Sequence, residues 1–324
     1  MNLFLAGVQG FIIAMVLLVC ELIYFKIAGK YNIIDKPNVR SSHNYITIRG
    51  GGIVFWIAAI LYAAFAVAGE RATSLHIPFL VGVTLIAAVS LWDDISSLPN
   101  RIRIIIHFLS ISLVFYGLDL YSVLPWHFIL AAYILFVGIL NAYNFMDGIN
   151  GITGLYSLIV LIALQYANRK YLFTAPDFIH YAMIACLVFL FFNCRKKAKC
   201  FAGDIGSMAI SFWIVTLLLQ LMLKTHSVIW IMFLAVYGVD SILTIIHRLC
   251  LKQNIFKPHR LHFYQILANE KRLSHPLVSF LYATIQLLIC GLIVRIHVAH
   301  PQHEILAAIA VSLLLSGVYL LKFR

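Results

Sequence analysis

Long apolar runs separated by short polar stretches cover almost the whole chain. An apolar helix of about 20 residues crosses a hydrocarbon core of about 30 Å, and each run is close to that length. The pattern predicts eleven membrane-spanning helices, at residues 3–25, 53–68, 77–92, 104–118, 126–140, 152–167, 178–192, 208–223, 228–246, 276–296 and 304–321. The gaps are too short for a separate water-soluble domain, so we expect a single all-α integral-membrane domain over residues 1–324.

The composition supports a membrane protein. Of the 324 residues, 63% are hydrophobic and 11% are charged, and the mean hydropathy is +0.96. A water-soluble fold cannot bury so many apolar side chains. Internal repeats, which many membrane transporters carry, are not evident in the sequence. We therefore expect a polytopic membrane protein without the repeat architecture of those transporters.

The distribution of basic residues predicts the orientation of the chain. An odd number of spans places the termini on opposite sides of the membrane. With the N-terminus outside, 19 of the 24 Lys and Arg residues fall in cytoplasmic loops, and the others are Arg71, Arg169, Lys170, Lys224 and Arg295. Because basic residues favour the cytoplasmic side, we predict an outer N-terminus and a cytoplasmic C-terminus. The net charge of +12 is then explained by contact with membrane lipid, and no nucleic acid is expected.

Four carboxylates lie on the same predicted side of the membrane, namely Asp93, Asp94, Asp147 and Asp204, each at the edge of a span. Orientation in the membrane requires basic residues there but no acids. A site that holds a divalent cation and a polyanion requires both kinds of charge. We take this clustering as the main functional signal in the sequence.

The most polar span end is the sequence N-A-Y-N-F-M-D-G-I-N-G at residues 141–151. A bilayer core does not tolerate this composition, so a helix should end here and present Asn141, Asn144 and Asp147 to the membrane face. Asn144 and Asp147 are three residues apart on one helical face and can reach one ion or one phosphate. Ordinary turn chemistry of Asn and Gly is the alternative interpretation.

Two other span ends carry acids. Asp93 and Asp94 end the third span, where adjacent carboxylates suit a base and a partner for a metal ion. Alternatively, Asp94 caps its own turn together with Ser96 and Ser97. Asp204 begins the eighth span in G-D-I-G-S, where backbone N–H groups and a carboxylate meet, although a capped helix start explains this motif equally well.

Three further groups of charged residues accompany these acids. The first loop, residues 33–52, contains Arg40, His43 and Arg49 and ends in three glycines, whose backbone N–H groups can bind an anion. Alternatively, the first loop is an ordinary turn whose arginines only favour the cytoplasmic side of the membrane. Arg101 and Arg103 begin the fourth span and face either the same pocket or lipid head groups.

The longest cytoplasmic loop contains P-H-R-L-H-F-Y-Q, with His259, Arg260 and His262. Imidazole and guanidinium donors in one short stretch suit a pyrophosphate, and a solvated basic loop is the alternative. Before it, Asp240 lies inside the ninth span, where an unpaired charge is costly. His247 and Arg248 are the partners that the sequence suggests for Asp240, and its role is either structural or catalytic.

The order of these motifs resembles a known family. Asp93-Asp94, N-A-Y-N-F-M-D-G-I-N-G, G-D-I-G-S and P-H-R-L-H, within residues 35–265, are similar to the polyprenyl-phosphate N-acetylhexosamine-1-phosphate transferases of glycosyltransferase family 4. The resemblance implies transfer of an N-acetylhexosamine 1-phosphate from a UDP-sugar to undecaprenyl phosphate, with release of UMP. It also implies Mg²⁺, or Mn²⁺ in its place, and an active site on the cytoplasmic face of a bacterial inner membrane. A homodimer is left open.

Residue roles in the family carry over only to matching positions. Asn144 and Asp204 match its metal ligands. Asp93 matches the carboxylate that activates the lipid phosphate, with Asp94 beside it, and Asp147 matches another essential acid. The resemblance assigns the donor pyrophosphate and nucleotide to Asn141, His259, Arg260 and His262, and the lipid phosphate or the first loop to Arg40, His43 and Arg49.

The sequence also departs from the family pattern. Ile48 and Tyr237 stand where the family usually has proline, and the multi-histidine tract of the phospho-N-acetylmuramoyl-pentapeptide transferases is reduced to H-R-L-H. The reduced tract favours an enzyme that initiates a surface glycan such as O-antigen or capsule. Two rivals stay open. A transporter of an anionic metabolite would carry ionisable groups near the bilayer centre, and a glycan-assembly scaffold would keep the fold without catalysis.

Overall fold

The computed structural model describes residues 3–37, 45–70, 73–254 and 259–323. It is 79% helical, which confirms the predicted all-α fold class. The α-helices of the described residues are α1 (Leu3–Lys30), α2 (Ile53–Ala68), α3 (His76–Ile95), α4 (Asn100–Gly117), α5 (Leu120–Val123), α6 (Trp126–Met146), α7 (Ile152–Tyr171), α8 (Pro176–Asn193), α9 (Gly203–Thr225), α10 (Ala235–Cys250), α11 (Phe263–Asn269), α12 (His275–Ala299) and α13 (Glu304–Leu320).

Short elements connect these helices. Three 3₁₀-helices occur in the second half of the described chain, η1 (Ile229–Leu234), η2 (Pro301–His303) and η3 (Leu321–Phe323). Two short strands, β1 (Ile34–Asp35) and β2 (Thr47–Ile48), pair antiparallel in the first loop. A parallel bridge from Ile48 to Cys200 joins this strand pair to the segment before α9. The hydropathy pattern did not predict the strands or α11.

The predicted spans coincide with helices. Each of the eleven apolar segments lies on a long helix, with residues 228–246 shared between η1 and α10. Among the described residues, eight helical segments are long and apolar enough to cross a membrane, and α2 is apolar but shorter. The polytopic membrane fold is therefore confirmed, while the sidedness of the termini stays a prediction.

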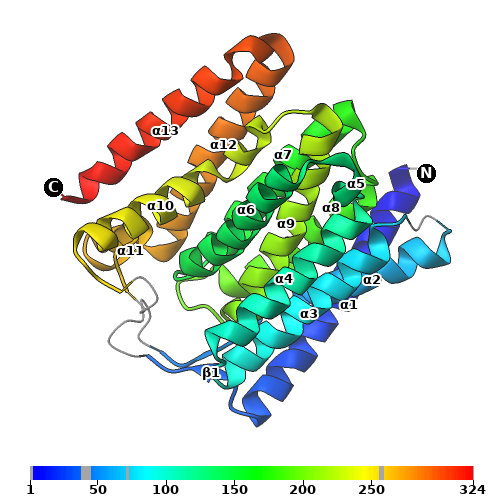
Figure 1. The fold of residues 1–324 in the computed structure, drawn as a ribbon. Helices are drawn as coiled ribbons and strands as arrows, with labels where there is room; N and C mark the ends of the chain where they lie inside the picture. Colours follow the sequence, from blue (N-terminus) through cyan, green and yellow to red (C-terminus); the bar gives the residue numbers. More distant parts are fainter. Residues whose placement is uncertain (1–2, 38–44, 71–72, 255–258, 324) are drawn as a thin grey trace.

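Helix α9 forms the centre of the bundle. In the apolar 18-residue stretch of α9, 83% of the residues are buried, against 22% in the corresponding stretch of the segment that contains α13. It packs against α2, α3, α6 and α7, whereas α12 and α13 stand at one edge of the molecule (Figure 1). Because Asp204 lies in the first turn of this central helix, neighbouring helix ends can reach its carboxylate.

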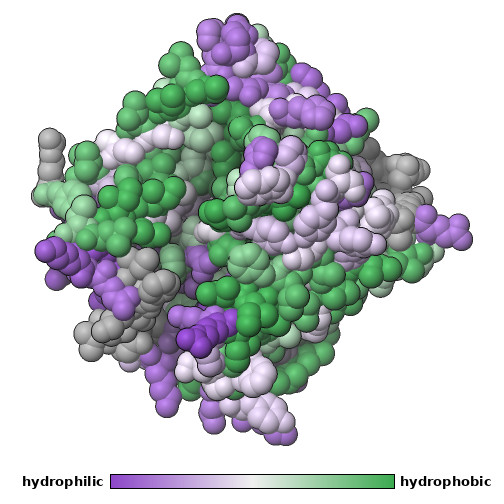
Figure 2. Space-filling view, viewed as in Figure 1, coloured by the Kyte–Doolittle hydropathy of each residue, from purple (hydrophilic) through white to green (hydrophobic). Residues whose placement is uncertain are grey.

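The outer surface is that of a protein surrounded by lipid. On the face shown in Figure 2, hydrophobic side chains cover much of the sides of the bundle, and hydrophilic ones are concentrated toward its ends. On α13, Leu313 and Leu314 are 68% and 70% exposed. Exposed leucine side chains of this kind are stable in hydrocarbon and costly in water.

Candidate active site

Two arginines and three aspartates meet where α3 ends and where α4 and α9 begin. Arg103 of α4 contacts Asp93 Oδ2 at 2.7 Å and Asp204 Oδ2 at 3.3 Å. Arg49, which follows β2, contacts Asp94 Oδ1 at 2.7 Å and Asp204 Oδ1 at 3.4 Å. Asp204 therefore lies between two guanidinium groups, each of which also holds one member of the Asp93-Asp94 pair. We call these five residues the charge cluster.

The carboxylate of Asp94 caps the start of α9. Its side chain is fully buried, and it accepts the backbone N–H of Asp204 at 2.9 Å and of Ile205 at 3.1 Å. A carboxylate at a helix N-terminus satisfies N–H groups that lack a partner within the helix and interacts favourably with the helix dipole. These N–H groups are thus occupied by the protein itself, and the expectation that they form part of a ligand site is wrong.

The two adjacent aspartates have different partners. The alternative in which Asp94 caps its own turn with Ser96 and Ser97 is wrong, because its carboxylate points to α9. Asp93 instead caps that turn, since its Oδ1 accepts the backbone N–H of Leu98 at 2.7 Å. The side chain of Asp93 keeps some solvent exposure, 12% against 0% for Asp94. Asp93 is therefore the member of the pair that a substrate can approach.

Close contact between two glycines brings α2 against α9. A Cβ atom on Gly52 would overlap the backbone of Gly206, and a Cβ atom on Gly206 would overlap Gly52. The backbone N–H of Gly51 donates to the carbonyl of Phe201 at 2.8 Å, and that of Gly52 donates to the carbonyl of Ala202 at 3.0 Å. The N–H groups of Gly51 and Gly52 are therefore taken up by the protein and are not free to bind an anion. The glycines instead pack the end of the first loop onto α9.

Arg49 is held in place by α1 and by the strand pair. The hydroxyl of Tyr24 in α1 donates to the carbonyl of Arg49 at 2.8 Å, and the preceding Ile48 bridges to Cys200. Burial alone would lower the pKa of Arg49, but the charges of Asp94 and Asp204 raise it above its ordinary value. The guanidinium is therefore firmly cationic and fixed in position beside the two carboxylates.

Helix α6 brings Asn144 and Asp147 to the same region. Asn144 Nδ2 donates to Ser207 Oγ at 3.2 Å, one turn after Asp204 in α9. Asp147 follows the last residue of α6, and its Oδ1 accepts the hydroxyl of Thr153 at 2.6 Å. Burial and the charge of Asp204 raise the pKa of Asp147 to about 7, against the opposing effect of the Thr153 hydrogen bond. Both residues thus border on Asp204.

The loop of His259, Arg260 and His262 reaches residues 141–151 through α11. The hydroxyl of Tyr264 donates to the carbonyl of Phe145 at 2.9 Å, and the Tyr264 ring lies so close to Gly148 that a Cβ atom there would overlap it. His262 is the N-cap residue of α11, and its ring centroid lies 6.2 Å from that of Phe145. The structure therefore brings this loop beside the segment that carries Asn144.

His259 lies against His262, with ring centroids 4.9 Å apart. Burial and the charges of His262 and Arg248 lower the pKa of His259 to about 4, so its imidazole is neutral at pH 7. Its Nδ1 accepts the backbone N–H of Leu261 at 3.3 Å, which leaves Nε2–H as a donor. His259 can therefore serve as a hydrogen-bond donor but not as a cation. Arg260 is half-buried beside it.

Asp240 does not pair with His247 or Arg248, and that expectation is wrong. Its Oδ1 lies 3.2 Å from Nδ1 of His262 and accepts the backbone N–H of Phe263 at 3.0 Å. Arg248 instead contacts the chain that follows α10. The buried carboxylate of α10 is thus an anchor for the start of α11. A partner so distant in sequence could not be read from the local pattern.

Three more predicted site residues remain to be placed, namely Asn141, Arg40 and His43. Asn141 lies one turn before Asn144, but its amide donates to the carbonyl of Val137 in its own helix at 2.8 Å. Arg40 and His43 lie outside the residues that the structure describes. Their assigned roles stay predictions.

Arg103 is the site residue that the sequence analysis left undecided. The structure separates it from Arg101, which is exposed at the start of α4. Two residues two positions apart on a helix lie about 200° apart around its axis, so both cannot face one pocket. This spacing was the available signal that only one of the two arginines belongs to the site.

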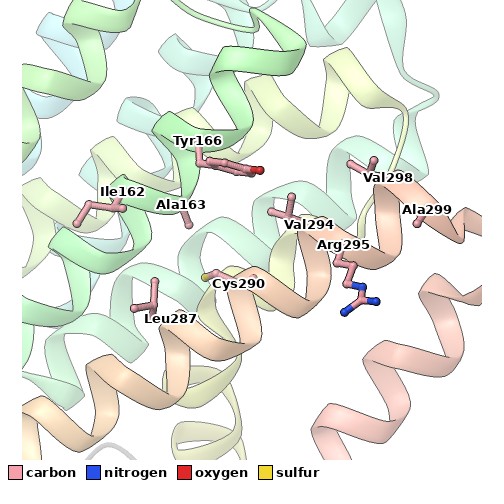
Figure 3. A pocket seen from close by; sticks show the side chains of 10 residues that line it. Ile162, Ala163, Tyr166, Leu287, Cys290, Val294, Arg295, Val298 and Ala299 are labelled. Carbon is pink, nitrogen blue, oxygen red and sulfur yellow. The ribbon is translucent and has the colours of Figure 1, made fainter.

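An apolar cavity lies elsewhere in the molecule. It has a volume of about 500 Å³ and lies between α7 and α12, lined mainly by apolar side chains such as Ile162, Leu287 and Val294, with Tyr166 and Arg295 at its margin (Figure 3). The charge cluster contributes no residue to it. A phosphate-bearing substrate requires polar partners, so this apolar crevice is not the candidate active site.

An all-α membrane fold with two arginines and several carboxylates gathered at its helix ends defines a polytopic membrane protein with a site suited to phosphate groups. Residues 76–222, which include α3, α4, α6 and α9, match glycosyl transferase family 4. Over these residues the chain is similar to this family.

Comparison with known proteins gives the same result. A "Probable undecaprenyl-phosphate N-acetylglucosaminyl 1-phosphate transferase" of Bacillus subtilis (strain 168) is 29% identical over 80% of this chain and 76% of its own length. Proteins named "Undecaprenyl-phosphate alpha-N-acetylglucosaminyl 1-phosphate transferase" are 26% identical in Salmonella typhi, over 75% of this chain and 71% of the relative, and in Yersinia pestis, over 90% and 85%. The chain is similar to these proteins.

Proposed function

We propose that the protein transfers an N-acetylhexosamine 1-phosphate from a UDP-sugar to undecaprenyl phosphate. The observation that carries the proposal is the charge cluster, in which Asp204 lies between Arg49 and Arg103. All of its residues except Arg49 fall inside the region that matches the family. The names of the relatives supply the substrates, undecaprenyl phosphate and a donor of N-acetylglucosamine 1-phosphate. A UDP-sugar is the donor that the family resemblance implies.

The residues present fit a magnesium ion. Mg²⁺ prefers oxygen ligands and is commonly held by one or two carboxylates, with substrate phosphates and water completing its shell. Among the described residues, no group of three or more His, Cys, Asp or Glu side chains is arranged to hold a metal ion, so a magnesium ion here would depend on substrate phosphates and water for most of its ligands. Asn144 uses its Nδ2 to bond Ser207, and this leaves its amide oxygen as a ligand atom.

Asp204 is the carboxylate best suited to hold the ion. Its contacts to the two arginines, at 3.3 Å and 3.4 Å, are longer than the 2.7 Å contacts that Arg103 and Arg49 make with Asp93 and Asp94. Each carboxylate oxygen also has a second lone pair. Asp204 and Asn144 would hold the Mg²⁺, which when bound neutralises charge on the donor pyrophosphate and on the leaving UMP.

The arginines bring two anionic substrates together. The lipid phosphate and the donor pyrophosphate repel each other, and fixed cations beside them reduce this repulsion without reorganisation during the reaction. Each of Arg49 and Arg103 is held by one carboxylate of α3 and by Asp204 of α9, so their guanidinium groups are already in position. His259 and Arg260 add hydrogen-bond donors from the loop before α11.

Asp93 is placed to act on the lipid phosphate. It is more exposed than Asp94 and belongs to the same cluster as Asp204. In the proposed reaction, Asp93 accepts a proton from the lipid phosphate or orients it, and a phosphate oxygen attacks the β-phosphorus of the donor in line. The bond from the β-phosphorus to the oxygen of UMP breaks, which yields the lipid pyrophosphate-sugar. Under the predicted topology this occurs at the cytoplasmic face of the inner membrane.

Two alternatives make different predictions. A transporter of an anionic metabolite requires ionisable groups along a path through the membrane, whereas the charge cluster lies at helix ends. A non-catalytic scaffold would bind but not convert the substrates. The deciding experiment incubates purified protein with Mg²⁺, undecaprenyl phosphate and each of several tritiated UDP-N-acetylhexosamines. Labelled lipid and stoichiometric UMP support the proposal, and a lack of both with every donor overturns it.

A further inference from the structure

His262 has one ring nitrogen bound by the protein and one left without a partner. Its side chain is 3% exposed, and Nδ1 lies 3.2 Å from Asp240 Oδ1. Nε2 is buried and has no hydrogen-bond partner. A buried polar atom without a partner is costly and requires an explanation. The ring lies beside Phe145, next to Asn144. A ligand bound in the candidate active site would therefore supply the missing partner of Nε2.

Asp240 determines which ring nitrogen of His262 has no partner in the protein. A carboxylate only accepts hydrogen bonds, so Nδ1 must carry a proton. The same Oδ1 accepts the backbone N–H of Phe263 at 3.0 Å and the hydroxyl of Thr244 at 3.2 Å. Because Phe263 is the residue after His262, the carboxylate holds both the imidazole and the backbone at the start of α11.

The second oxygen of Asp240 ties this arrangement to another helix. Oδ2 accepts the hydroxyl of Tyr282 in α12 at 2.8 Å and the backbone N–H of Tyr264 at 3.5 Å. Tyr264 in turn donates to the carbonyl of Phe145. The carboxylate is thus anchored to α10 and α12, on one side of the molecule (Figure 1), while α11 connects it to the segment with Asn144.

We propose that Asp240 is a positioning residue that sets the tautomer and orientation of His262, so that Nε2 meets a polar group of the UDP-sugar. The proposal rests on the proposed function, because it takes the UDP-sugar as the ligand. Asp240 itself does not touch the substrate. Its role is comparable to that of other carboxylates that orient a histidine through Nδ1 and leave Nε2 for the reacting partner.

A double-mutant cycle tests this role. Asp240→Asn and His262→Gln should each lower kcat/KM for the UDP-sugar about 10- to 100-fold, with KM for undecaprenyl phosphate unchanged. In the His262→Gln background, Asp240→Asn should have little further effect, because the residue acts through His262. Tyr282→Phe is the matched control: it removes one hydrogen bond to the same carboxylate and should leave kcat/KM within about threefold of wild type.

The proposal is overturned if Asp240→Asn retains the wild-type kcat/KM, or if its effect multiplies with that of His262→Gln. A multiplied effect would mean a general structural role. If the wild-type protein transfers no sugar phosphate at all, the proposed function itself fails. This outcome is distinguishable because the assay of the wild-type protein shows it before any variant is compared.

A measurement on the wild-type protein covers the case in which Asp240→Asn does not fold. ¹⁵N NMR of histidine-labelled protein, with the His262 signals assigned by their loss in His262→Gln, reports which nitrogen is protonated. The expected result is a protonated Nδ1, and titration with UDP-N-acetylglucosamine in the absence of undecaprenyl phosphate should shift the Nε2 signal. A ring protonated only at Nε2, or an Nε2 signal that UDP-N-acetylglucosamine does not move, would contradict the proposal.

Discussion

The carboxylate of Asp94 accepts the backbone N–H of Asp204 at 2.9 Å, across 110 residues of sequence. This hydrogen bond joins the end of α3 to the start of the central helix α9. It also gives the two adjacent aspartates different roles, because the carboxylate of Asp94 caps the start of α9 while that of Asp93 remains partly exposed. The position of Asp204 in the site therefore depends on a residue that no substrate needs to touch.

The Asp94→Asn substitution should destabilise the protein. The asparagine amide has only one acceptor oxygen, so its NH₂ group would face one of the two backbone N–H groups that the carboxylate accepts. The ion pair with Arg49 would also be lost. Leaving a buried donor unsatisfied costs about 1–3 kcal/mol. We expect a lower Tm in detergent, measured by thermal unfolding, together with reduced transfer activity.

Asp93→Asn is the matched control for this substitution. Its carboxylate contacts Leu98 and Arg103, at the edge of the site, so the loss of Tm should be smaller while the loss of activity is at least as large. A larger drop in Tm for Asp93→Asn than for Asp94→Asn would contradict this division of roles.

The Gly52→Ala substitution should disturb the packing of α2 on α9. The added Cβ would overlap the backbone of Gly206, which cannot move aside as a side chain can. Overpacking of this kind costs about 1–3 kcal/mol, and we expect a lower yield of monodisperse protein by size-exclusion chromatography. Gly138→Ala has open space around the new atom and should behave as wild type. Equal yields for both variants would argue against the close glycine contact.

Replacing Arg103 by lysine should impair catalysis without unfolding the protein. A guanidinium contacts Asp93 and Asp204 at once, whereas a single ammonium group cannot reproduce both contacts. Loss of one charge-assisted hydrogen bond is worth about 10- to 100-fold in kcat/KM. Arg101→Lys, at an exposed position two residues away, should leave the rate unchanged. If both variants were equally active, Arg103 would not belong to the site.

The stability of the protein should depend on pH through His259. Its pKa in the folded protein is about 4, below the ordinary value of 6.5. A folded state that favours the neutral ring is stabilised above pH 6.5 and loses this contribution as the pH falls from 6.5 toward 4. The wild-type Tm should therefore fall more steeply over this range than that of His259→Gln. Identical slopes would show that His259 is not buried in its neutral form.

The hydropathy pattern predicted where the helices lie and which polar residues mark their ends. Apolar runs must form helices in a membrane because every backbone group needs a partner within the segment. A carboxylate or amide such as Asp204 or Asn144 is then confined to a helix end. This reasoning found most residues of the charge cluster before any contact was known.

The partners of these residues could not be predicted in the same way. Which of Asp93 and Asp94 faces α9 depends on the rotation of α3 about its axis, and an error of one residue turns a side chain by about 100°. The pairing of Asp240 with His262 depends on the path of a loop. Anion binding was one interpretation of the glycines before α2, and only the contact of Gly52 with Gly206 in α9 reveals a packing role.

The most direct test of the central claim is transfer of tritiated N-acetylglucosamine 1-phosphate from UDP-N-acetylglucosamine to undecaprenyl phosphate by the wild-type protein and by Asp204→Asn. The account predicts labelled lipid and UMP from the wild type, loss of product when Mg²⁺ is chelated, and a rate at least about 100-fold lower for Asp204→Asn. Labelled lipid formed by Asp204→Asn at the wild-type rate would contradict the assignment of Asp204 to the active site.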